Sequence, residues 1–309
     1  MNQIITIQTN HPKRIPHGWI LYTAGDSSLN PHYIRLYENA CEKRGMSVWL
    51  GMYEPSLLCD EGALQRLRTL LVCEAPAFVI NRTRDYRLAE LLEAMGICVY
   101  NNSRVARLGN DKAQAYRYMI QRGIPVMPVL YGLEEPPRWY PAVAKSCDGH
   151  GGTQVYLIRD KAMWEKWKAQ MLKEAAVCTG QLKQYVIQQA ASDLGKDVRA
   201  YLVGGRIAAA VLRTSETDFR SNYCLGGSVE LYRLSAHERE LVQRAAAGLS
   251  IGMAGIDFLF HHGTMVFNEI EDMVGARGLY SLTDYDIVDE YIGYIQEEWE
   301  HGAEKSKDL

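Results

Sequence analysis

Three carboxylates lie close together in the C-terminal third of the sequence. GIDFLF places Asp257 on one predicted strand, and VFNEIE places Glu269 and Glu271 on the next. Because residues two apart on a strand point to the same face, Glu269 and Glu271 project together, and Asp257 joins them if the strands pair across HHGT. Such carboxylates raise one another's pKa unless a cation lies between them, and their oxygens suit Mg²⁺ completed by phosphate oxygens. A strand with a solvated acidic face would show the same pattern.

A glycine-rich segment, SCDGHGG, spans residues 146–152 and follows a predicted strand that ends in Lys145. Glycines such as Gly149, Gly151 and Gly152 let backbone N–H groups turn toward a phosphate, and Lys145 adds a positive charge beside it. The segment matches neither GxxxxGK[ST] nor GxGxxG, which excludes a P-loop and a dinucleotide fingerprint. A simple hairpin turn is the alternative interpretation.

A second group of cations lies between these two motifs. Arg199 and Arg213 occupy successive predicted strands, and FRSN adds Arg220 and Asn222. Guanidinium groups bind phosphates and carboxylates in a bidentate manner, as an acyl-phosphate would require. Exposed strand arginines paired with surface acids are the alternative.

The first hundred residues alternate between apolar strands and helices. The strands are expected at Gly18–Gly25, Ser47–Gly51, Ala77–Asn81 and Ile97–Asn101. The helices between them are expected from Asn30-Pro31 to Arg44-Gly45, at Glu61–Val72 and at Leu88–Met95. Alternation with short, glycine-marked joints predicts a parallel sheet covered by helices, and therefore a small α/β domain at residues 1–100.

The rest of the chain is predicted to mix strands and helices. Helices are expected at Asp111–Gln121, Lys161–Ala176 and Glu238–Leu249. Two strands are expected within Pro141–Ile158, and one at Val126–Leu130. Further strands are expected in YVIQQA, DVRAYLVGG, RIAAAVLRT, FRSNYCLGG, GIDFLF and MVFNEIE. A hairpin turn is expected at His261-His262-Gly263. Only the tail, residues 301–309, is expected to be disordered.

Composition excludes several classes of protein. A chain of 309 residues suits two or three modest domains, and a net charge of -3 argues against nucleic-acid binding. The seven cysteines form no CxxC pair, which is typical of a reduced, cytosolic protein without a zinc site. The first 18 residues do not resemble a signal peptide, and no apolar run is long enough to span a membrane, so we expect a cytoplasmic protein without a membrane partner.

In their order along the chain these motifs resemble a known family. The stretch from Asn101 to Tyr280 resembles the ATP-grasp fold, most closely its RimK-type branch, in which amino acids are added to carboxyl ends. The similar strings are NDKAQAYRYMIQRGIPVMP, PAVAKSCDGHGGTQV, VIQQAASDLGKDVRAYLVGGRIAAAVLRT, FRSNYCLGG, GIDFLF and NEIEDMVGARG. The resemblance implies an α/β chain with a central subdomain at 101–184 and a C-terminal subdomain at 185–300 that clasp ATP, after the N-terminal domain and before a tail at 301–309.

The resemblance also implies residue roles. Lys112 and Lys145 would contact ATP phosphates, Gln188, Gln189 and Ala190 would line the adenine hinge, and Asp197 would lie near the ribose. Phosphates and the acyl-phosphate would be held by Arg199, Arg213, Arg220, Ser221 and Asn222. The metal ligands would be Asp257, Glu269 and Glu271.

Three departures from the family pattern affect these roles. Glu269-Ile270-Glu271 stands where the family usually has Glu-x-Asn, which leaves metal number and preference open between Mg²⁺ and Mn²⁺. The hinge has Gln188-Gln189 where a glutamate is usual. MVGARG differs from the usual SPGLEG, so the substrate end of the site is expected to differ as well.

The implied activity is that of an ATP-dependent carboxylate–amine ligase that forms an amide through an acyl-phosphate and releases ADP and phosphate. Alternatives are a D-alanine–D-alanine-type or other ATP-grasp ligase and a non-catalytic nucleotide-binding regulatory module. A small amino acid or peptide is the expected substrate, with Arg277 and the pair Arg82 and Arg84 as candidates for its carboxylate, although Arg82 and Arg84 also suit a solvated loop. We expect a homo-oligomer because the resembling enzymes often associate.

Overall fold

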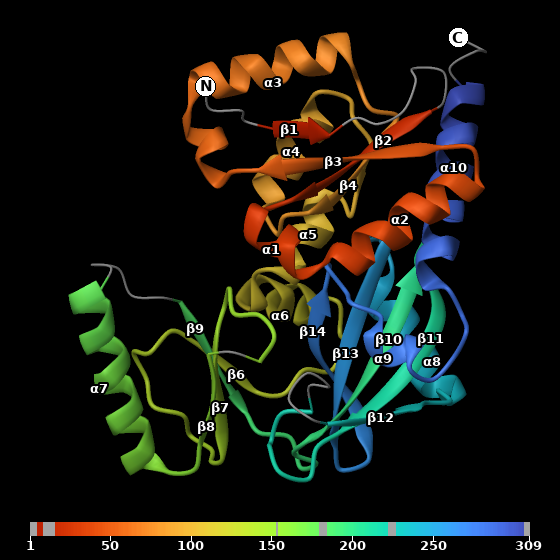
Figure 1. Ribbon diagram of the computed structural model, residues 1–309. Coiled ribbons are helices and arrows are strands. Elements are labelled where there is room, and N and C mark those ends of the chain that lie inside the picture. Colours follow the sequence, from red (N-terminus) through yellow and green to blue (C-terminus); the bar gives the residue numbers. More distant parts are fainter. Residues whose placement is uncertain (1–4, 9–15, 153, 179–183, 222–226, 306–309) are drawn as a thin grey trace.

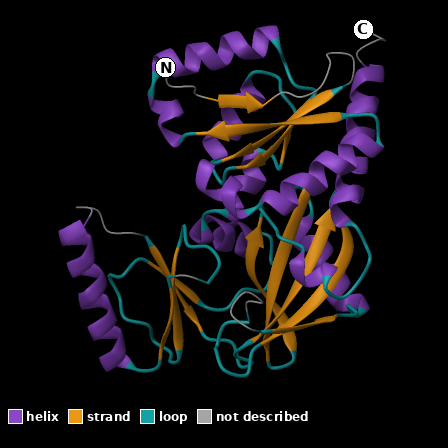
Figure 2. Ribbon diagram, viewed as in Figure 1, coloured by secondary structure: helices purple, strands orange, loops and turns teal. Residues whose placement is uncertain are grey.

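The protein folds around three β-sheets that follow one another along the chain. The computed structural model describes residues 5–8, 16–152, 154–178, 184–221 and 227–305. Strands β1–β5 form the first sheet, β6–β9 the second and β10–β14 the third (Figure 1). Helices flank the strands of each sheet (Figure 2). The predicted mixed α/β class is confirmed.

The N-terminal sheet has the strand order β1-β3-β2-β4-β5. Its strands are β1 (Ile5–Gln8), β2 (His17–Tyr22), β3 (Ser47–Tyr53), β4 (Phe78–Arg82) and β5 (Val99–Tyr100). Strands β2 to β5 pair in parallel, as predicted. The antiparallel edge strand β1 was not predicted; it pairs with β3.

The helices described in this part are α1 (Ala24–Leu29), α2 (Pro31–Lys43), the 3-10 helix η1 (Pro55–Cys59), α3 (Glu61–Cys73) and α4 (Tyr86–Ala94). Three of the five, α1, α3 and α4, begin at side-chain caps. The predicted strand Gly18–Gly25 is too long by three residues. The Thr23 hydroxyl accepts a hydrogen bond from the Asp26 N–H, which ends the strand and starts α1.

The central sheet is antiparallel in the order β6-β9-β7-β8. Helices α5 (Ser103–Gly109) and α6 (Lys112–Gln121) precede it, and its elements are β6 (Val129–Tyr131), β7 (Ala142–Ser146), β8 (Val155–Ile158), α7 (Lys161–Cys178) and β9 (Tyr185–Gln189). Helix α5 was not predicted. Because β9 pairs with β6 and β7, it belongs to the central sheet, whereas the predicted boundary at 184/185 would assign it to the C-terminal subdomain.

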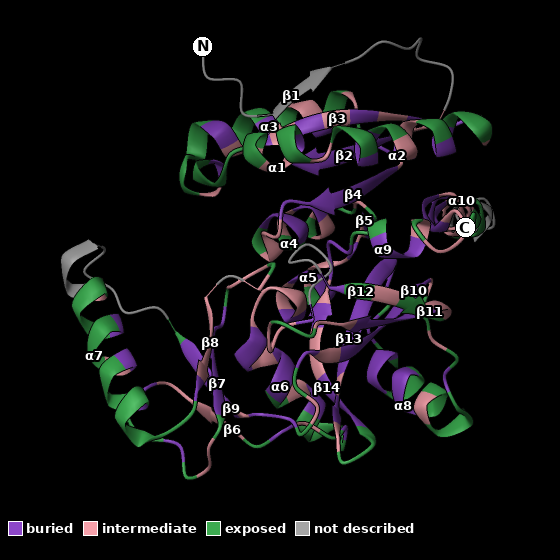
Figure 3. Cartoon of the chain, turned by 60° about the horizontal axis from the view of Figure 1, so that its bottom comes forward, coloured by how far each residue is buried: buried purple, intermediate pink, exposed green. Residues whose placement is uncertain are grey.

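Helix α7 covers one face of the central sheet. Trp164, Trp167 and Met171 recur at helical spacing and are buried in the same apolar cluster as Tyr185 and Ile187 of β9. Most of the remaining surface of α7 is exposed (Figure 3). The opposite face of the sheet is therefore free to border a pocket.

The C-terminal sheet is antiparallel in the order β12-β11-β10-β13-β14. Its strands are β10 (Lys196–Val203), β11 (Arg206–Thr214), β12 (Ser228–Leu231), β13 (Met253–His261) and β14 (Thr264–Glu271), and its helices are α8 (Ala236–Ala246), α9 (Arg277–Tyr280) and α10 (Ile287–Lys305). His262 and Gly263 have positive φ at the predicted hairpin turn, which is confirmed.

Two predictions for this part are wrong. The segment FRSNYCLGG is not a strand over Phe219–Ser221; residues 222–226 lie outside the described residues, and β12 begins only at Ser228. The expected disorder of residues 301–309 fails for the first five, because α10 continues to Lys305. Among the described residues, no helix is both long enough and apolar enough to cross a membrane.

Buried polar side chains attach the N-terminal sheet to the C-terminal one. The Arg82 guanidinium at the end of β4 is 4% exposed and donates to the carbonyls of Met273 (3.1 Å) and Val274 (3.5 Å). The Asn101 amide donates to the Met253 and Asp272 carbonyls, both at 2.8 Å. Apolar side chains from β2 and β4 lie in one cluster with those of β13 and α10. The two sheets are therefore joined by a common core.

We expect Arg82→Met to lower the free energy of unfolding by about 2–4 kcal/mol, because it leaves two buried carbonyls without a charged donor. Arg68→Met is the matched control, since Arg68 is half exposed and, in the described part of the chain, forms an ion pair with the exposed Glu61; it should change stability by less than about 0.5 kcal/mol. Urea titration monitored by circular dichroism measures both. Equal stability of the two variants would contradict the role of Arg82.

Candidate active site

A pocket lies between the central and C-terminal sheets, which stand side by side in Figure 1. Its walls come from the start of α6, the glycine-rich loop after β7, the end of β9 and the facing strands β10, β13 and β14. All three predicted motifs contribute to it. The pocket is lined by Lys145 from the central sheet and by Asp197 and Glu269 from the C-terminal sheet. Two separate antiparallel sheets therefore bring the motifs together.

Lys145 is the buried cation of the central sheet. Its Nζ donates to the Tyr116 hydroxyl (3.1 Å), to Gln188 Oε1 (2.8 Å) and to Asn268 Oδ1 (2.7 Å). All three partners are neutral. Burial therefore lowers the pKa of Lys145 to about 8, although the charge of Glu269 acts in the opposite direction.

Lys112 and Arg220 each donate to a backbone carbonyl of the glycine-rich loop. Lys112 Nζ donates to the Gly149 carbonyl (2.6 Å) and lies 3.3 Å from Glu269 Oε2. The Arg220 guanidinium donates to the Gly152 carbonyl (2.7 Å). Gly151 and Gly152 have φ of 62° and 75°, a conformation in which a larger residue would be strained. The loop is therefore shaped by glycine and fixed by two cations.

The predicted hinge residues Gln188, Gln189 and Ala190 line the pocket where β9 ends. Gln188 is almost completely buried, and its Oε1 accepts from Lys145. Its Nε2 has no hydrogen-bond partner among the described residues. The Gln188 amide is therefore held by its oxygen, while its nitrogen is buried without a partner in this part of the structure.

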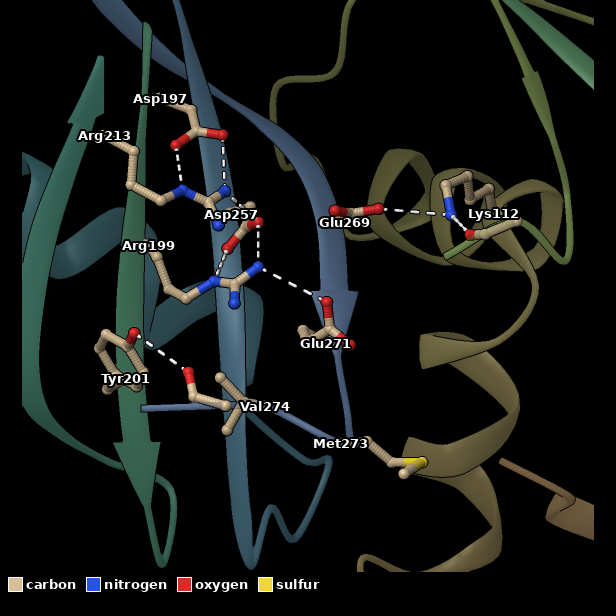
Figure 4. Close-up of polar contacts among 12 residues, drawn as sticks. Lys112, Asp197, Arg199, Tyr201, Arg213, Asp257, Glu269, Glu271, Met273 and Val274 are labelled. Atoms are coloured by element: carbon tan, nitrogen blue, oxygen red, sulfur yellow. Dashed lines mark hydrogen bonds and ion pairs between the residues drawn. The ribbon is translucent and has the colours of Figure 1, made fainter. Parts of the chain in front are cut away.

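Two arginines and two aspartates form a buried ionic chain across β10, β11 and β13 (Figure 4). Arg213 makes two bonds of 2.6 Å to Asp197 and a third of 2.6 Å to Asp257. Arg199 makes two bonds of 2.7 Å to Asp257. Burial alone would raise the pKa of Asp257, but the two guanidinium groups lower it to about 2. Asp257 is thus a permanent anion.

The two glutamates border this chain on β14. Asp257 pairs with Glu269 and Gly255 with Glu271 in the strand register. Glu269 points toward Lys112, and Glu271 points toward Arg199 at 3.5 Å (Figure 4). Burial opposes ionisation of Glu269, yet the charge of Lys112 holds its pKa below the usual value. Within the described part of the chain, no three carboxylate, His or Cys side chains are arranged to hold a metal ion by themselves.

Charges in the site balance formally. Five cations face five carboxylates: Lys112, Lys145, Arg199, Arg213 and Arg220 against Asp197, Asp218, Asp257, Glu269 and Glu271. The sum is zero before any ligand binds. A polyanionic ligand would therefore bring uncompensated negative charge into the site.

The remaining predicted residues fall into three groups. Ser221 is buried and lines the pocket beside Arg220. Asn222 lies outside the described residues. Arg277 is exposed at the start of α9, and Arg82 is buried against Met273 and Val274, so neither is among the pocket-lining residues. Their placement does not favour the predicted contact with a substrate carboxylate.

Sequence analysis missed His150 and Asn268, which both line the pocket. His150 lies in the glycine-rich loop, and burial together with the charges of Arg84 and Lys112 lowers its pKa to about 4. Regular strand alternation would place Asn268 on the face opposite Glu269. The β13–β14 register shifts beside Asp257, so that both Asn268 and Glu269 reach the pocket.

Comparison with known proteins agrees with this geometry. The RimK-like ATP-grasp domain matches residues 136–295. A probable alpha-L-glutamate ligase from Haemophilus ducreyi is 27% identical over 251 residues, which cover 78% of this chain and 77% of that protein. The chain belongs to the RimK-like ATP-grasp family.

Solved structures show the same fold. A RimK domain ATP-grasp protein from Sphaerobacter thermophilus superposes with a TM-score of 0.62 at 19% identity, covering 91% of this chain and 98% of that one. The D-alanine–D-alanine ligase from Bacillus anthracis, solved with ATP, gives 0.65 at 12% identity and covers 94% and 99%. The predicted fold and the predicted enzyme class, an ATP-grasp ligase, are confirmed.

The lowered pKa of Lys145 predicts weaker ATP binding at alkaline pH. As the pH rises from 7 to 9, Lys145 loses the charge that would contact a phosphate, and we expect the Kd of ATP to rise about tenfold. The folded-state pKa lies below the model-peptide value of 10.5, so this group makes folding more favourable as the pH rises from about 8 to 10.5. The titration of Lys145 therefore does not weaken ATP binding at pH 9 by unfolding the protein.

Calorimetric titration with ATP at both pH values measures this change. Lys145→Met should bind weakly at each pH and lose most of the pH dependence. The exposed Lys43 provides the control Lys43→Met, which should behave as the unsubstituted protein. An unchanged pH dependence in Lys145→Met would assign the effect to another group.

Proposed function

We propose that this ATP-grasp ligase joins a carboxylate to an amine through an acyl-phosphate and releases ADP and phosphate. The observation that carries the proposal is one pocket lined by Lys112, Lys145 and the glycine-rich loop. The buried Arg199–Asp257–Arg213 chain lies behind its wall and pairs with two lining residues, Asp197 and Glu271. These are charge-binding groups held in place before any ligand arrives. Catalysis of phosphoryl transfer needs such positioning and charge stabilisation more than a protein nucleophile.

The two lysines and the loop are suited to the triphosphate. Lys145 is buried beside the hinge residue Gln188, so it would contact the phosphate nearest the nucleoside. Lys112 lies beside Gly149 and Glu269, farther along the pocket, where it would contact the terminal phosphates. Arg220, bonded to the Gly152 carbonyl at 2.7 Å, would close the loop over them. Asp197 and Ser221 would border the ribose and phosphates, respectively.

The charge balance supports a divalent cation as a companion of ATP. Because the site is formally neutral, the protein alone does not offset the charge of a triphosphate. Mg²⁺ is usually held by one or two carboxylates together with phosphate oxygens. Glu269 and Glu271 fit that donor set, since among the described residues each makes one ion pair, at 3.3 and 3.5 Å respectively. Both oxygens of Asp257 accept hydrogen bonds from arginines. We therefore propose that Asp257 orients Arg199 and Arg213 and is not the main metal ligand.

Bound Mg²⁺ would polarise the γ-phosphate and neutralise charge as the phosphoryl group moves. The chain's own residues would do the rest. A substrate carboxylate oxygen would attack the γ-phosphorus as the bond to ADP breaks, with Lys112 and Arg199 stabilising the charge that develops. An amine would then attack the acyl carbon and phosphate would leave. Mn²⁺ has the same oxygen preference and stays an alternative metal.

The relatives' name supports an amino-acid substrate. The Haemophilus ducreyi protein is called a probable alpha-L-glutamate ligase. We propose glutamate as the first amino acid to test in this chain, joined to a carboxylate of a small amino acid or peptide. Homo-oligomerisation and a cytoplasmic location stay predictions.

Phosphate release tests the proposal. With Mg-ATP, glutamate and a panel of amino acids and acidic peptides, we expect release that requires one particular pair and a product mass that equals the amide. ATP binding without release for every pair would favour a non-catalytic nucleotide-binding module. Phosphate release only when D-alanine serves as both substrates would favour the D-alanine–D-alanine type of ligase.

Glu269→Gln should lower kcat about 10²–10³-fold with the fold intact, because it removes one charge of the proposed metal pair. The matched control is Glu230→Gln on the exposed face of β12, for which no change is expected. Steady-state rates at several Mg²⁺ concentrations and melting curves measure turnover and folding separately. Undiminished turnover in Glu269→Gln would refute the metal assignment.

A further inference from the structure

Asn268 lines the pocket on β14, directly before the proposed metal ligand Glu269. The register shift between Asp257 and Phe258 of the neighbouring strand brings it to the pocket wall. Its Oδ1 accepts a hydrogen bond of 2.7 Å from Lys145 Nζ, the shortest of the three that this ammonium group makes. Asn268 therefore joins the buried cation of the central sheet to the C-terminal sheet.

The ammonium group of Lys145 has no N–H left over for a ligand. Such a group has three N–H donors, and those of Lys145 are bonded to Tyr116, Gln188 and Asn268. Tyr116 and Gln188 are almost completely buried and hold their bonds away from solvent. A phosphate oxygen near Lys145 gains from the positive charge, but a full hydrogen bond must come from a donor beside it.

The amide nitrogen of Asn268 is such a donor. Because Oδ1 accepts from Lys145, which can only donate, Nδ2 occupies the other branch of the amide. No described residue accepts a hydrogen bond from Nδ2, and this atom is not one of the buried atoms that lack a partner, so solvent reaches it. The Lys145–Asn268 bond is also only partly buried, in contrast to the bonds of Lys145 to Tyr116 and Gln188. The donor is therefore accessible from the pocket.

The position of Asn268 relates it to the phosphate nearest the nucleoside. It is bonded to Lys145, which also donates to the hinge residue Gln188. Glu269, the next residue, points instead toward Lys112 (Figure 4). Gln188 cannot make the same contact, because its own amide nitrogen is buried. Two consecutive residues of β14 thus serve different parts of the pocket.

We propose that Asn268 Nδ2 donates a hydrogen bond to the phosphate of ATP that lies beside Lys145, while Oδ1 keeps the Lys145 ammonium group in place. A hydrogen bond to an anionic oxygen is stronger than one between neutral groups. One amide thereby contacts the cation through its oxygen and the anion through its nitrogen. The proposal rests on the proposed function, since it assigns a further binding residue to the same ATP site.

A series of nucleotides separates a phosphate contact from a general change in the pocket. Adenosine, AMP and ADP each displace a fluorescent ATP analogue from the protein at one fixed Mg²⁺ concentration. Asn268→Leu replaces the amide by an apolar group with the same number of heavy atoms. We expect it to raise the Kd of AMP and of ADP about 10–100-fold. The Kd of adenosine should stay unchanged, because adenosine has no phosphate.

Asn268→Ala should give the same pattern without adding bulk to the pocket. The matched control is Asn39→Leu, since Asn39 is exposed on α2 and is not one of the residues that line the ATP pocket. All three ligands should bind to this control as they bind to the unsubstituted protein. Melting curves of all variants report whether each folds.

A double variant tests whether Asn268 acts by its own donor. Lys145→Met combined with Asn268→Leu should bind AMP and ADP more weakly than Lys145→Met alone, because the Nδ2 donor is lost in addition to the charge. If Asn268 acted only by holding Lys145, the second substitution would change nothing in that background.

Three results would overturn the assignment: unchanged binding of AMP and ADP in both Asn268 variants, an equal loss for adenosine, or no further loss in the double variant. The outcomes also separate the two proposals. Selective loss of nucleotide binding, together with no phosphate release by the unsubstituted protein for any substrate pair, would leave the Asn268 contact standing and refute the ligase reaction. Phosphate release whose KM for ATP is unaffected by Asn268→Leu would do the reverse.

Discussion

The active site depends on keeping two arginines charged and fixed inside the protein. Arg199 and Arg213 are at most 9% exposed, and an isolated buried charge is strongly unfavourable. Asp257 accepts hydrogen bonds from both guanidinium groups, and Asp197 forms a second ion pair with Arg213. Breaking such a buried set by removing one partner typically costs about 3–5 kcal/mol, so its members act as one unit. The fixed guanidinium groups that we propose to face a phosphoryl group are a consequence of this arrangement.

The antiparallel C-terminal sheet is what makes the ionic chain possible. Arg199 on β10 faces Asp257 on β13, while Asp197 on β10 faces Arg213 on β11. Each strand therefore supplies the counter-charge of its neighbour. The bulge between β13 and β14 then turns Asn268 toward Lys145 as well as Glu269 toward Lys112. The central sheet is covered by α7 on one face. Its Lys145 and the glycine-rich loop lie opposite the charged residues of the C-terminal sheet.

The N-terminal sheet is attached to the C-terminal sheet by buried polar side chains. Arg82 and Asn101 bond to backbone carbonyls around β13 and the end of β14, which fixes the sheet against the C-terminal one. That docking brings the carboxyl ends of β2 and β4 toward the pocket. Two arginines separated by one residue thus differ in environment: Arg82 is buried as a structural donor, and Arg84 is partly exposed beside Asp26.

Much of this architecture could be predicted from local patterns. The alternation of strand and helix indicates the parallel N-terminal sheet, and the two-residue spacing of Glu269 and Glu271 with the HHGT turn indicates their approach to Asp257. The glycine-rich loop beside Lys145 is also visible as a string. These features depend on near neighbours in the chain or on periodicity, which a sequence displays directly. The short edge strand β1, helix α5 and the end of α10 carry weaker local signals.

What the sequence by itself determined was the class of the protein and the residue types that would meet: lysines, arginines and carboxylates in a definite order along an ATP-grasp chain. Only the tertiary structure decided which of them pair. Contacts such as Arg84 with Asp26, or Lys145 with Asn268, join residues 58 and 123 positions apart. A bulge shifts a strand's register, and domain docking buries one arginine while leaving another accessible. Such contacts depend on the packing of whole sheets, which no local spacing encodes.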